Sequence, residues 1–298
     1  MKQVVILSGK GGTGKTSVCA SFAWLFSKSH PENRPVLVDA DVDAANLSLI
    51  LQPFSSMQHE FWGGGLAEIN EEKCVGCGLC ESVCRYDAIL IHKNHQDKRV
   101  IDPIACDGCA ACTYICPQRA IEMIKQKEGF WYQSETSVGP LFHAELFPGR
   151  DNSGKLVTMV KQQARLYAED NQSSLMIIDG PPGIGCPVIS ACAGADLGLV
   201  VAEPSQAGIH DLKRILSTLT HFQIPAKICI NKADIYPAGT EEIRKYAHAN
   251  GYEVIGEIPY DESIPKAMLE GKPVNEFLPE AEASLALEKI WIILELFL

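Results

Sequence analysis

The sequence predicts an α/β fold, a doubly wound and mostly parallel sheet interrupted by a small α+β domain. Short apolar segments alternate with amphipathic ones near both ends of the chain, which is typical of strands covered by helices on both faces. A glycine-rich loop, 9-GKGGTGKT-16, follows the first apolar segment. The alternation stops over residues 58–126, where cysteine and glycine dominate. We therefore expect a discontinuous main domain, residues 1–57 and 127–298, and an inserted domain, residues 58–126.

Apolar runs and helical periodicity place the elements in order. Residues 3–7 form the first predicted strand, and residues 15–29 follow as a helix with Val18, Phe22 and Phe26 on its apolar face. Residues 35–39 form a second buried strand. The same criteria predict further strands at 174–179, 197–203, 226–231 and 253–259, and helices at 155–169, 206–221, 240–250, 264–269 and 279–298.

Two segments allow more than one interpretation. Residues 129–146 alternate loosely and are interpreted as a hairpin leading out of the insert. The final segment, 285-LALEKIWIILELFL-298, is either a membrane-surface helix or a helix packed on the sheet. A membrane-surface helix needs lysine and arginine on its polar face, whereas Glu288 and Glu295 lie there with a single lysine. Packing on the sheet is therefore expected.

The composition of the 298 residues indicates a soluble globular protein, 46% hydrophobic and 21% charged. A net charge of −11 argues against a general nucleic-acid binder, which needs a basic surface. The sequence has no export signal and no long uncharged apolar run, so we expect a cytoplasmic protein without stable membrane insertion.

The glycine-rich loop fits the phosphate-binding pattern G-x-x-x-x-G-K-[ST]. Glycines let successive backbone N–H groups surround phosphate oxygens, and the helix that follows presents its positive end to the same anion. Lys15 supplies a charge for the β- and γ-phosphates, and the Thr16 hydroxyl is placed to bind Mg²⁺. The predicted nucleotide-binding residues of this segment are Gly9, Lys10, Gly11, Gly12, Thr13, Gly14, Lys15, Thr16 and Ser17.

The second lysine in the loop, Lys10, makes it resemble the deviant Walker A ATPases, the class of MinD/ParA, Mrp and the nitrogenase iron protein. The resemblance implies Mg²⁺-dependent ATP hydrolysis by a nucleotide-dependent dimer, formed with a second copy or with a related ATPase. In that class the lysine at the position of Lys10 reaches the phosphates of the partner's ATP. Lys10, Lys15 and Asp41 are thus the expected catalytic residues.

Two further segments match the class, 39-DADVDAAN-46 and 179-DGPPGIG-185. Both follow predicted strands, whose carboxyl ends meet beside the phosphate loop in this topology. By resemblance, Asp41 positions or deprotonates the attacking water, while Asp39 and Asp179 support Mg²⁺ or its waters. The resemblance also implies adenine contacts by Asn231, at the end of a strand, and by Pro259.

The insert contains two identical cysteine runs, 74-CVGCGLCESVC-84 and 106-CDGCAACTYIC-116, offset by 32 residues. The spacing C-x2-C-x2-C-x3-C is that of bacterial ferredoxins. A disulfide scaffold is disfavoured in a chain without an export signal, and a zinc site needs only pairs of cysteines. We therefore expect two [4Fe-4S] clusters in a ferredoxin-like fold.

The fourth cysteine of each run is expected to bind the other cluster, as in two-cluster ferredoxins. One predicted ligand set is Cys74, Cys77, Cys80 and Cys116, and the other is Cys84, Cys106, Cys109 and Cys112. Arg85 stands where the pattern has proline, which is expected to change polarity near a cluster and leave ligation intact. Cys186 is either a structural thiol or a ligand of a cluster shared between subunits, for which a second upstream cysteine is missing.

With the insert included, the chain resembles MinD-superfamily P-loop ATPases that carry an inserted ferredoxin domain. The resemblance implies coupling of nucleotide state to electron transfer or to docking of a redox protein. An iron–sulfur cluster carrier of the Mrp type is the alternative, and a MinD/ParA-like spatial organiser is the second alternative. Four ligands per centre favour stable clusters over transferable ones. An organiser would need a basic helix or tail to bind a membrane or nucleoid surface, and the sequence shows neither.

Overall fold

The computed structural model describes residues 1–150 and 153–298 and divides the chain into two compact units. The large unit comprises Met1–His59 and Phe130–Leu298, and the small unit comprises Glu60–Gly129. Each unit has a core of its own, and the two are described separately.

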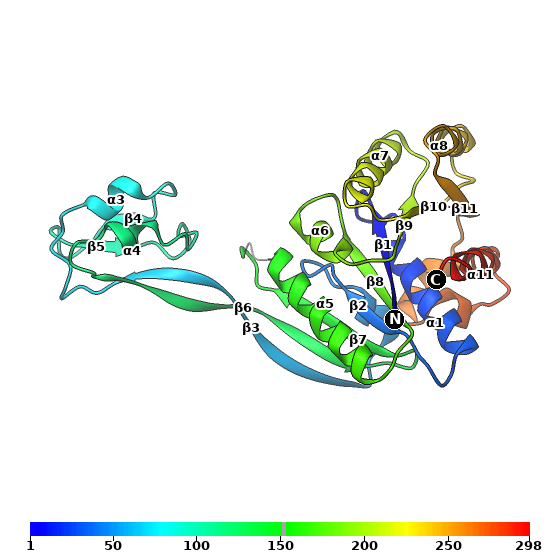
Figure 1. Ribbon diagram of the computed structural model, residues 1–298, viewed down its shortest axis with the longest axis horizontal. Helices are drawn as coiled ribbons and strands as arrows, with labels where there is room; N and C mark the ends of the chain where they lie inside the picture. The colour runs from blue at the N-terminus through cyan, green and yellow to red at the C-terminus, as the bar shows by residue number, and fades with distance from the viewer. Residues whose placement is uncertain (151–152) are drawn as a thin grey trace. The chain divides into compact units, whose positions relative to one another are not determined.

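The large unit is built on a nine-stranded sheet of order β11-β10-β9-β1-β8-β2-β7-β6-β3 (Figure 1). In that order the strands are β11 (Glu253–Ile258), β10 (Ala226–Asn231), β9 (Leu197–Ala202), β1 (Lys2–Ser8), β8 (Leu175–Pro182), β2 (Val36–Asp39), β7 (Pro140–Leu146), β6 (Ile121–Glu135) and β3 (Ser55–Ile69). Every pairing from β11 to β7 is parallel, so the mostly parallel sheet is confirmed.

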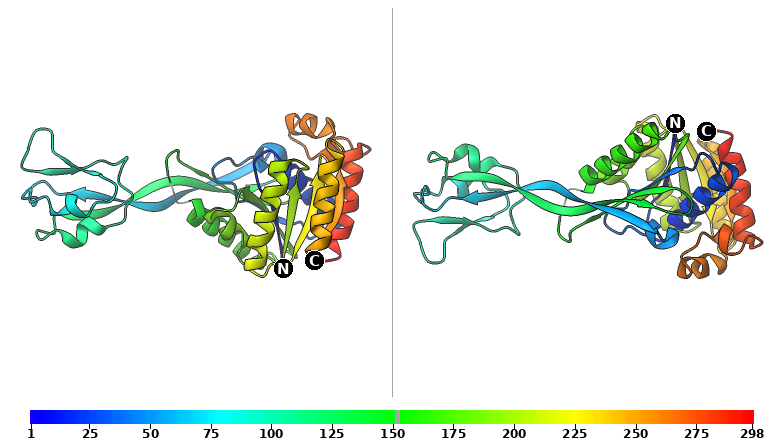
Figure 2. Two further views of the ribbon diagram at one scale, coloured as in Figure 1. Left: turned by 90° about the horizontal axis from the view of Figure 1, so that it is seen from above. Right: turned by 90° about the horizontal axis from the view of Figure 1, so that it is seen from below.

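Helices cover both faces of this sheet. One layer contains α5 (Ser153–Asp170), α6 (Cys186–Cys192), α7 (Gln206–His221) and α8 (Pro237–Ala249). The opposite layer contains α1 (Lys15–Ser29) and α11 (Glu282–Glu295), drawn in blue and red in Figure 2. Three short helices complete the unit, namely α2 (Leu47–Leu51), α9 (Ser263–Leu269) and α10 (Val274–Phe277).

The alternation of side chains along β1 divides the core between the two layers. Val4 and Ile6 belong to the core under α1 and α11, where the rings of Phe22 and Trp291 lie 5.2 Å apart. The C-terminal segment thus packs on the sheet through α11, with Trp291 buried. Within the described residues, no helix has both the length and the apolar character needed to cross a membrane.

The hairpin predicted over residues 129–146 is confirmed. Strands β6 and β7 are neighbours in the sheet and are joined by the turn 136–139, in which the Thr136 N–H donates to the Gly139 carbonyl. The sequence did not predict that β7 also pairs in parallel with β2 inside the sheet. β7 is buried from Pro140 to Ala144, because helix α5 covers it. The long strand β3 was not predicted at all, since 63-GGG-65 obscures its periodicity. A Cβ on Gly63 would lie 2.4 Å from a Glu128 carboxylate oxygen, so glycine makes room for that side chain.

The small unit repeats itself with the 32-residue offset of its sequence. Its regular elements beyond β3 and β6 are α3 (Leu79–Val83), β4 (Ile89–Ile91), β5 (Arg99–Ile101) and α4 (Ala111–Ile115), and β4 pairs with β5 in antiparallel orientation. The Asn70 N–H donates to the Ala120 carbonyl and the Asp102 N–H to the Ala88 carbonyl, both at 2.7 Å. Positive φ angles recur at equivalent positions, which are Gly76 and Gly108, Gly78 and Ala110, and Asp87 and Arg119. The internal duplication is therefore structural.

Candidate functional site

The phosphate loop links the carboxyl end of β1 to the first residue of α1. Gly12 and Gly14 have φ of 77° and 91°, a region that glycine adopts without steric cost. A Cβ on Gly9 would lie 2.0 Å from Asp211 Cβ in α7, so only glycine fits there. The loop therefore takes its shape from both its backbone angles and a close neighbour.

Lys15 forms a buried ion pair with Asp179 of β8, with 3.0 Å between Nζ and Oδ1. Burial alone would lower the pKa of Lys15, but the charge and hydrogen bond of Asp179 outweigh burial and raise it. The lysine is thus held protonated at the place where a phosphate anion would bind.

Asp179 also offers a second carboxylate oxygen. Among the described residues, its buried Oδ2 has no hydrogen-bond partner. An orphaned carboxylate oxygen next to the phosphate loop suits a water of hydrated Mg²⁺, which keeps several waters when bound to phosphates. The residues present therefore fit a Mg²⁺ ion, with Thr16, half-buried at the start of α1, as the second expected contributor.

Asp39 at the end of β2 shapes the segment that follows it. Its Oδ1 accepts from the Asp41 N–H at 3.1 Å, and its Oδ2 accepts from the Asn46 and Leu47 N–H groups at 3.0 and 2.9 Å. Burial, followed by the negative charge of Asp179, raises the pKa of Asp39 to about 7. The side chain expected to support Mg²⁺ thus also fixes the loop that carries Asp41.

Asp41 itself is half-buried. Burial raises its pKa, and the charge of Lys15 opposes that change. A raised pKa suits a carboxyl that accepts a proton from water.

Ser17, on the first turn of α1, donates its hydroxyl to the Met268 sulfur at 3.5 Å. The structure therefore gathers Lys15, Asp39, Asp41 and Asp179 and places Thr16 at the same edge of the sheet.

Lys10 lies in an ion pair that the sequence did not predict. Its Nζ is 3.0 Å from Oε2 of Glu203, which follows strand β9. The other oxygen of Glu203 is 3.9 Å from Nζ of Lys232. Glu203 stands at the carboxyl end of a predicted strand, the same signal that identified Asp39 and Asp179, but it matches no motif of the class.

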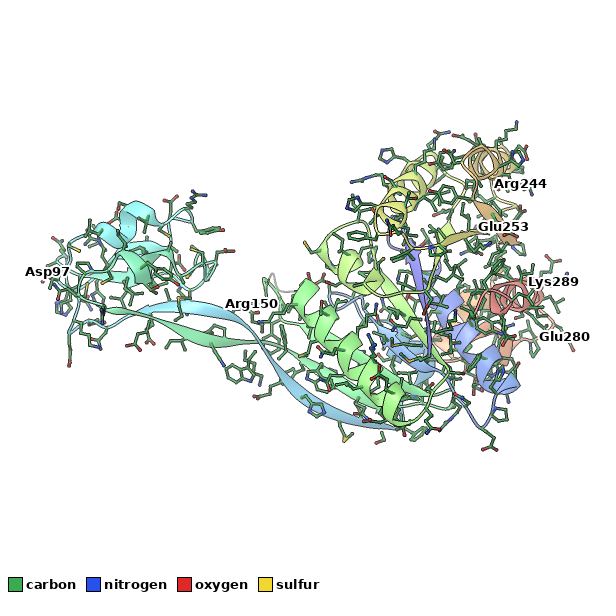
Figure 3. All side chains as sticks on the ribbon, in the orientation of Figure 1. Asp97, Arg150, Arg244, Glu253, Glu280 and Lys289 are labelled. Carbon is green, nitrogen blue, oxygen red and sulfur yellow. The ribbon has the colours of Figure 1, made fainter. Side chains whose placement is uncertain are left out.

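The two expected adenine contacts lie in different surroundings. The Asn231 side chain is buried and donates from Nδ2 to the Thr13 carbonyl at 2.7 Å, while its Oδ1 accepts from the Lys232 N–H at 3.0 Å. Asn231 therefore braces the phosphate loop in this state. Pro259 lines an open hollow with Asp234, Pro237 and Arg244, the last labelled in Figure 3. An adenine contact by Asn231 requires exchange of its present partners.

The eight cysteines of the two runs line two cavities in the small unit. The wall of one cavity includes Cys74, Cys77, Cys80 and Cys116. The wall of the other includes Cys84, Cys106, Cys109 and Cys112. The fourth cysteine of each run thus lies with the first three of the other run.

The number of cysteines in each cavity is the relevant observation for a metal group. Within residues 1–150 and 153–298, no three His, Cys, Asp or Glu side chains are placed to hold a single metal ion. Each cavity has four cysteines in its wall, which is the ligand number of a [4Fe-4S] cluster. Burial raises the pKa values of the inner thiols Cys80 and Cys112, so binding of iron would displace their protons. The donor sets therefore fit [4Fe-4S] clusters.

The four remaining cysteines fall into two classes. Cys19, Cys192 and Cys229 are buried, and burial raises the pKa of Cys192 to about 11 and of Cys229 to about 12. These three are packing residues. Cys186, the first residue of α6, is exposed, and none of the twelve cysteines forms a disulfide.

Comparisons with known proteins find relatives over most of the chain. The family described as the CobQ/CobB/MinD/ParA nucleotide binding domain matches residues 4–274. An uncharacterized protein of Methanocaldococcus jannaschii is 37% identical over 268 residues, which cover 89% of this chain and 86% of that protein. The solved structure of the septum site-determining protein MinD of Pyrococcus horikoshii, complexed with Mg-ADP, has a TM-score of 0.62 at 17% identity. The similarity covers 99% of this chain and 96% of the MinD chain.

A further relative matches a shorter part of the chain. An uncharacterized ferredoxin of Methanocaldococcus jannaschii is 27% identical over 115 residues, covering 38% of this chain and 64% of that protein. The chain is thus similar to nucleotide-binding proteins over most of its length and to a ferredoxin over a part.

Proposed function

Because the chain belongs to the CobQ/CobB/MinD/ParA nucleotide-binding family of P-loop ATPases, we propose that it is an ATP-hydrolysing switch that carries two [4Fe-4S] clusters. In this proposal the nucleotide state is coupled to electron transfer through the clusters to a redox partner protein. The observation that carries it is the division of eight cysteines into two four-cysteine cavities in a chain that also has a complete phosphate loop.

The nucleotide half of the proposal rests on the charges around the loop. Lys15 would exchange Asp179 for the β- and γ-phosphates, and Asp179 would then be free to hold a water of Mg²⁺. When bound, Mg²⁺ would offset the negative charge of the phosphates. Asp41 would accept the proton of the attacking water or orient that water. The related MinD structure with Mg-ADP supports a magnesium nucleotide as the ligand.

The dimer expected in this proposal depends on Lys10. Its side chain is 38% exposed and its partner Glu203 is 23% exposed, so the pair lies at the surface. On ATP binding, Lys10 would leave Glu203 and reach the phosphates bound to a second subunit. That subunit is a second copy of this chain or a related ATPase.

The two cysteine cavities favour clusters that stay in the protein over clusters that are transferred to other proteins. Each cavity is lined by four cysteines, the full ligand count of a [4Fe-4S] centre. A carrier that passes clusters to other proteins would need a ligand set that releases its cluster readily. Electron transfer is therefore the preferred role, and cluster delivery is the outcome that a labile cluster would indicate.

The experiment that tests this function compares the wild-type chain with Lys15→Ala after anaerobic iron–sulfur reconstitution. Wild-type protein should bind MgATP and hold about eight iron atoms per chain, the content of two four-iron clusters. Lys15→Ala should lose MgATP binding, measured by calorimetry, and keep its iron. Loss of iron in that variant would contradict two separate functional units, and an iron-free wild type would contradict the cluster assignment.

A further inference from the structure

The two cysteine cavities are equal in ligands but unequal in charge. The cavity of Cys74, Cys77, Cys80 and Cys116 has one charged side chain in its wall, Arg99. The cavity of Cys84, Cys106, Cys109 and Cys112 also has one, Asp107. The 32-residue repeat places uncharged Val75 at the position equivalent to Asp107, and uncharged Ala67, which lines the second cavity, at the position equivalent to Arg99. The charge difference is thus a departure from the internal duplication.

Arg99 is held firmly at its cavity. It is the first residue of β5, and its side chain is 15% exposed. Nε donates to Glu81 Oε2 at 2.9 Å, and Nη1 donates to the Lys98 carbonyl at 3.4 Å. A Cβ added to Gly78 would lie 3.5 Å from Nη2, so the guanidinium lies against the cysteine loop. A cation with this little exposure is screened only weakly by water.

Glu81 neutralises Arg99 only in part. Its side chain is 51% exposed, and it is not among the residues that line the cavity. Oε2 of Glu81 would lie 4.0 Å from a Cβ on Gly78, only slightly farther than Nη2 of Arg99, so the two charges differ in exposure more than in position. Water screens the more exposed carboxylate more strongly, and the positive charge therefore dominates the field in this cavity.

The charged side chain in the wall of the other cavity, Asp107, has the opposite sign, whereas Arg85, which follows Cys84 and whose charge also acts on Tyr86, is not part of that wall. Asp107 stands between Cys106 and Cys109, and the Tyr86 phenol, which lines the same cavity, shares a hydrogen bond with it. Both side chains are exposed, so water reduces the effect of this carboxylate more than it reduces that of Arg99.

We infer that the two clusters differ in reduction potential, and that the first electron to enter the pair settles on the cluster held by Cys74, Cys77, Cys80 and Cys116. Reduction adds one negative charge to a cluster. Arg99 stabilises that charge and raises the potential of the first cluster, whereas Asp107 disfavours it and lowers the potential of the second. This inference rests on the proposed presence of both clusters and adds a direction to the electron path.

The test is an anaerobic redox titration with dithionite as reductant, followed by EPR, on full-length reconstituted protein. Wild type should reduce in two separate steps. Arg99→Gln should lower the potential of the higher step alone, and Glu81→Gln should raise that same step because the counter-charge is removed. Asp107→Asn should raise the lower step alone, by a smaller amount.

Iron and sulfide content, measured in every sample, separates the inference from the proposed function. Protein without about eight irons per chain would overturn the function itself. Intact clusters that reduce in one unresolved step, or an Arg99→Gln shift in the same step as Asp107→Asn, would overturn the inference alone. Glu81→Gln keeps the guanidinium in place, so its opposite shift tests the charge argument even if Arg99→Gln disturbs the fold.

Discussion

At the scale of single residues, the two lysines of the phosphate loop differ in how strongly each is held. Lys15 and Asp179 are nearly inaccessible, with side-chain exposures of 7% and 1%. Breaking that pair without a substitute would leave a buried charge, which is costly. Lys10 and Glu203 are paired at the surface, where an ion pair contributes about 1 kcal/mol or less. ATP can therefore release Lys10 easily, while Lys15 is released only in exchange for phosphate.

We predict that Glu203→Gln strengthens ATP-dependent dimerisation, by about fivefold at most, because Lys10 no longer has to leave a carboxylate. Lys10→Ala should still bind MgATP but fail to dimerise or hydrolyse it. The double variant should behave as Lys10→Ala does. Dimerisation would be measured by sedimentation at a series of ATP concentrations, and an effect of Glu203→Gln in the Lys10→Ala background would show that Glu203 acts elsewhere.

His143 on β7 predicts a dependence of stability on pH. Burial lowers its pKa to about 4, and Nε2 lies 3.0 Å from the Ser134 hydroxyl. Unfolding returns the pKa to about 6.5, so the unfolded chain binds more protons between pH 4 and 6.5. The contribution of neutral His143 is complete above pH 6.5 and is lost as the pH falls to 4. The loss in free energy of unfolding is about 3 kcal/mol.

Denaturant unfolding at several pH values measures this effect. His143→Gln should show a shallower fall in stability between pH 6.5 and 4 than wild type does. His210→Gln is the matched control, because the His210 side chain is 70% exposed, and it should keep the wild-type slope. Equal slopes for wild type and His143→Gln would refute the assignment.

At the scale of elements, apolar runs were sufficient where both faces of a strand are buried. β1, β8, β9 and β10 are such strands, and the prediction placed each within three residues of its observed ends. The long strand β3 has a mostly exposed N-terminal half and three glycines, so it lacks both signals. The place of β7 beside β2 depends on a contact distant in sequence, which local patterns do not encode.

The candidate site divides in the same way, into residues that belong to local sequence motifs and residues that only the fold brings together. Lys15, the segment 39–46 and the cysteine runs belong to local motifs, and the residue types in these motifs indicate their chemistry. The partner of Lys10 and the brace formed by Asn231 come from strands distant in sequence that end at the same edge of the sheet. The charges of Arg99 and Asp107 are not part of the cysteine spacing pattern. Only the cavity walls show that these opposite charges lie at different cavities.

Alanine substitutions at Gly76 and Gly78, two glycines of the first cysteine run, are predicted to differ sharply in their effect on iron content. A Cβ on Gly76 would lie only 1.5 Å from the carbonyl oxygen of Asp97, the residue labelled in Figure 3. Gly76→Ala should therefore displace the loop of the first cluster and lower the iron content by about half. Gly78→Ala is the control, because its position has similar backbone angles but no neighbour closer than 3.5 Å, and its repeat equivalent is already Ala110. Iron analysis that shows equal loss in both variants would contradict the role of this contact.

At the scale of the whole molecule, one chain joins a unit with a phosphate loop and a unit with two cysteine cavities. The large unit supplies a phosphate loop whose lysines are paired with carboxylates, and the small unit supplies two cavities of four cysteines each. The strands β3 and β6 both begin in one unit and end in the other, so the two units share continuous backbone. Communication between ATP and the clusters is the central claim.

The most direct test is an anaerobic EPR redox titration of the reconstituted wild-type protein with and without MgATP. We predict that MgATP shifts a midpoint potential or changes the line shape of a reduced cluster, and that Lys15→Ala abolishes the change. Superimposable titrations from protein that binds MgATP and keeps both clusters would contradict coupling of the nucleotide state to the clusters.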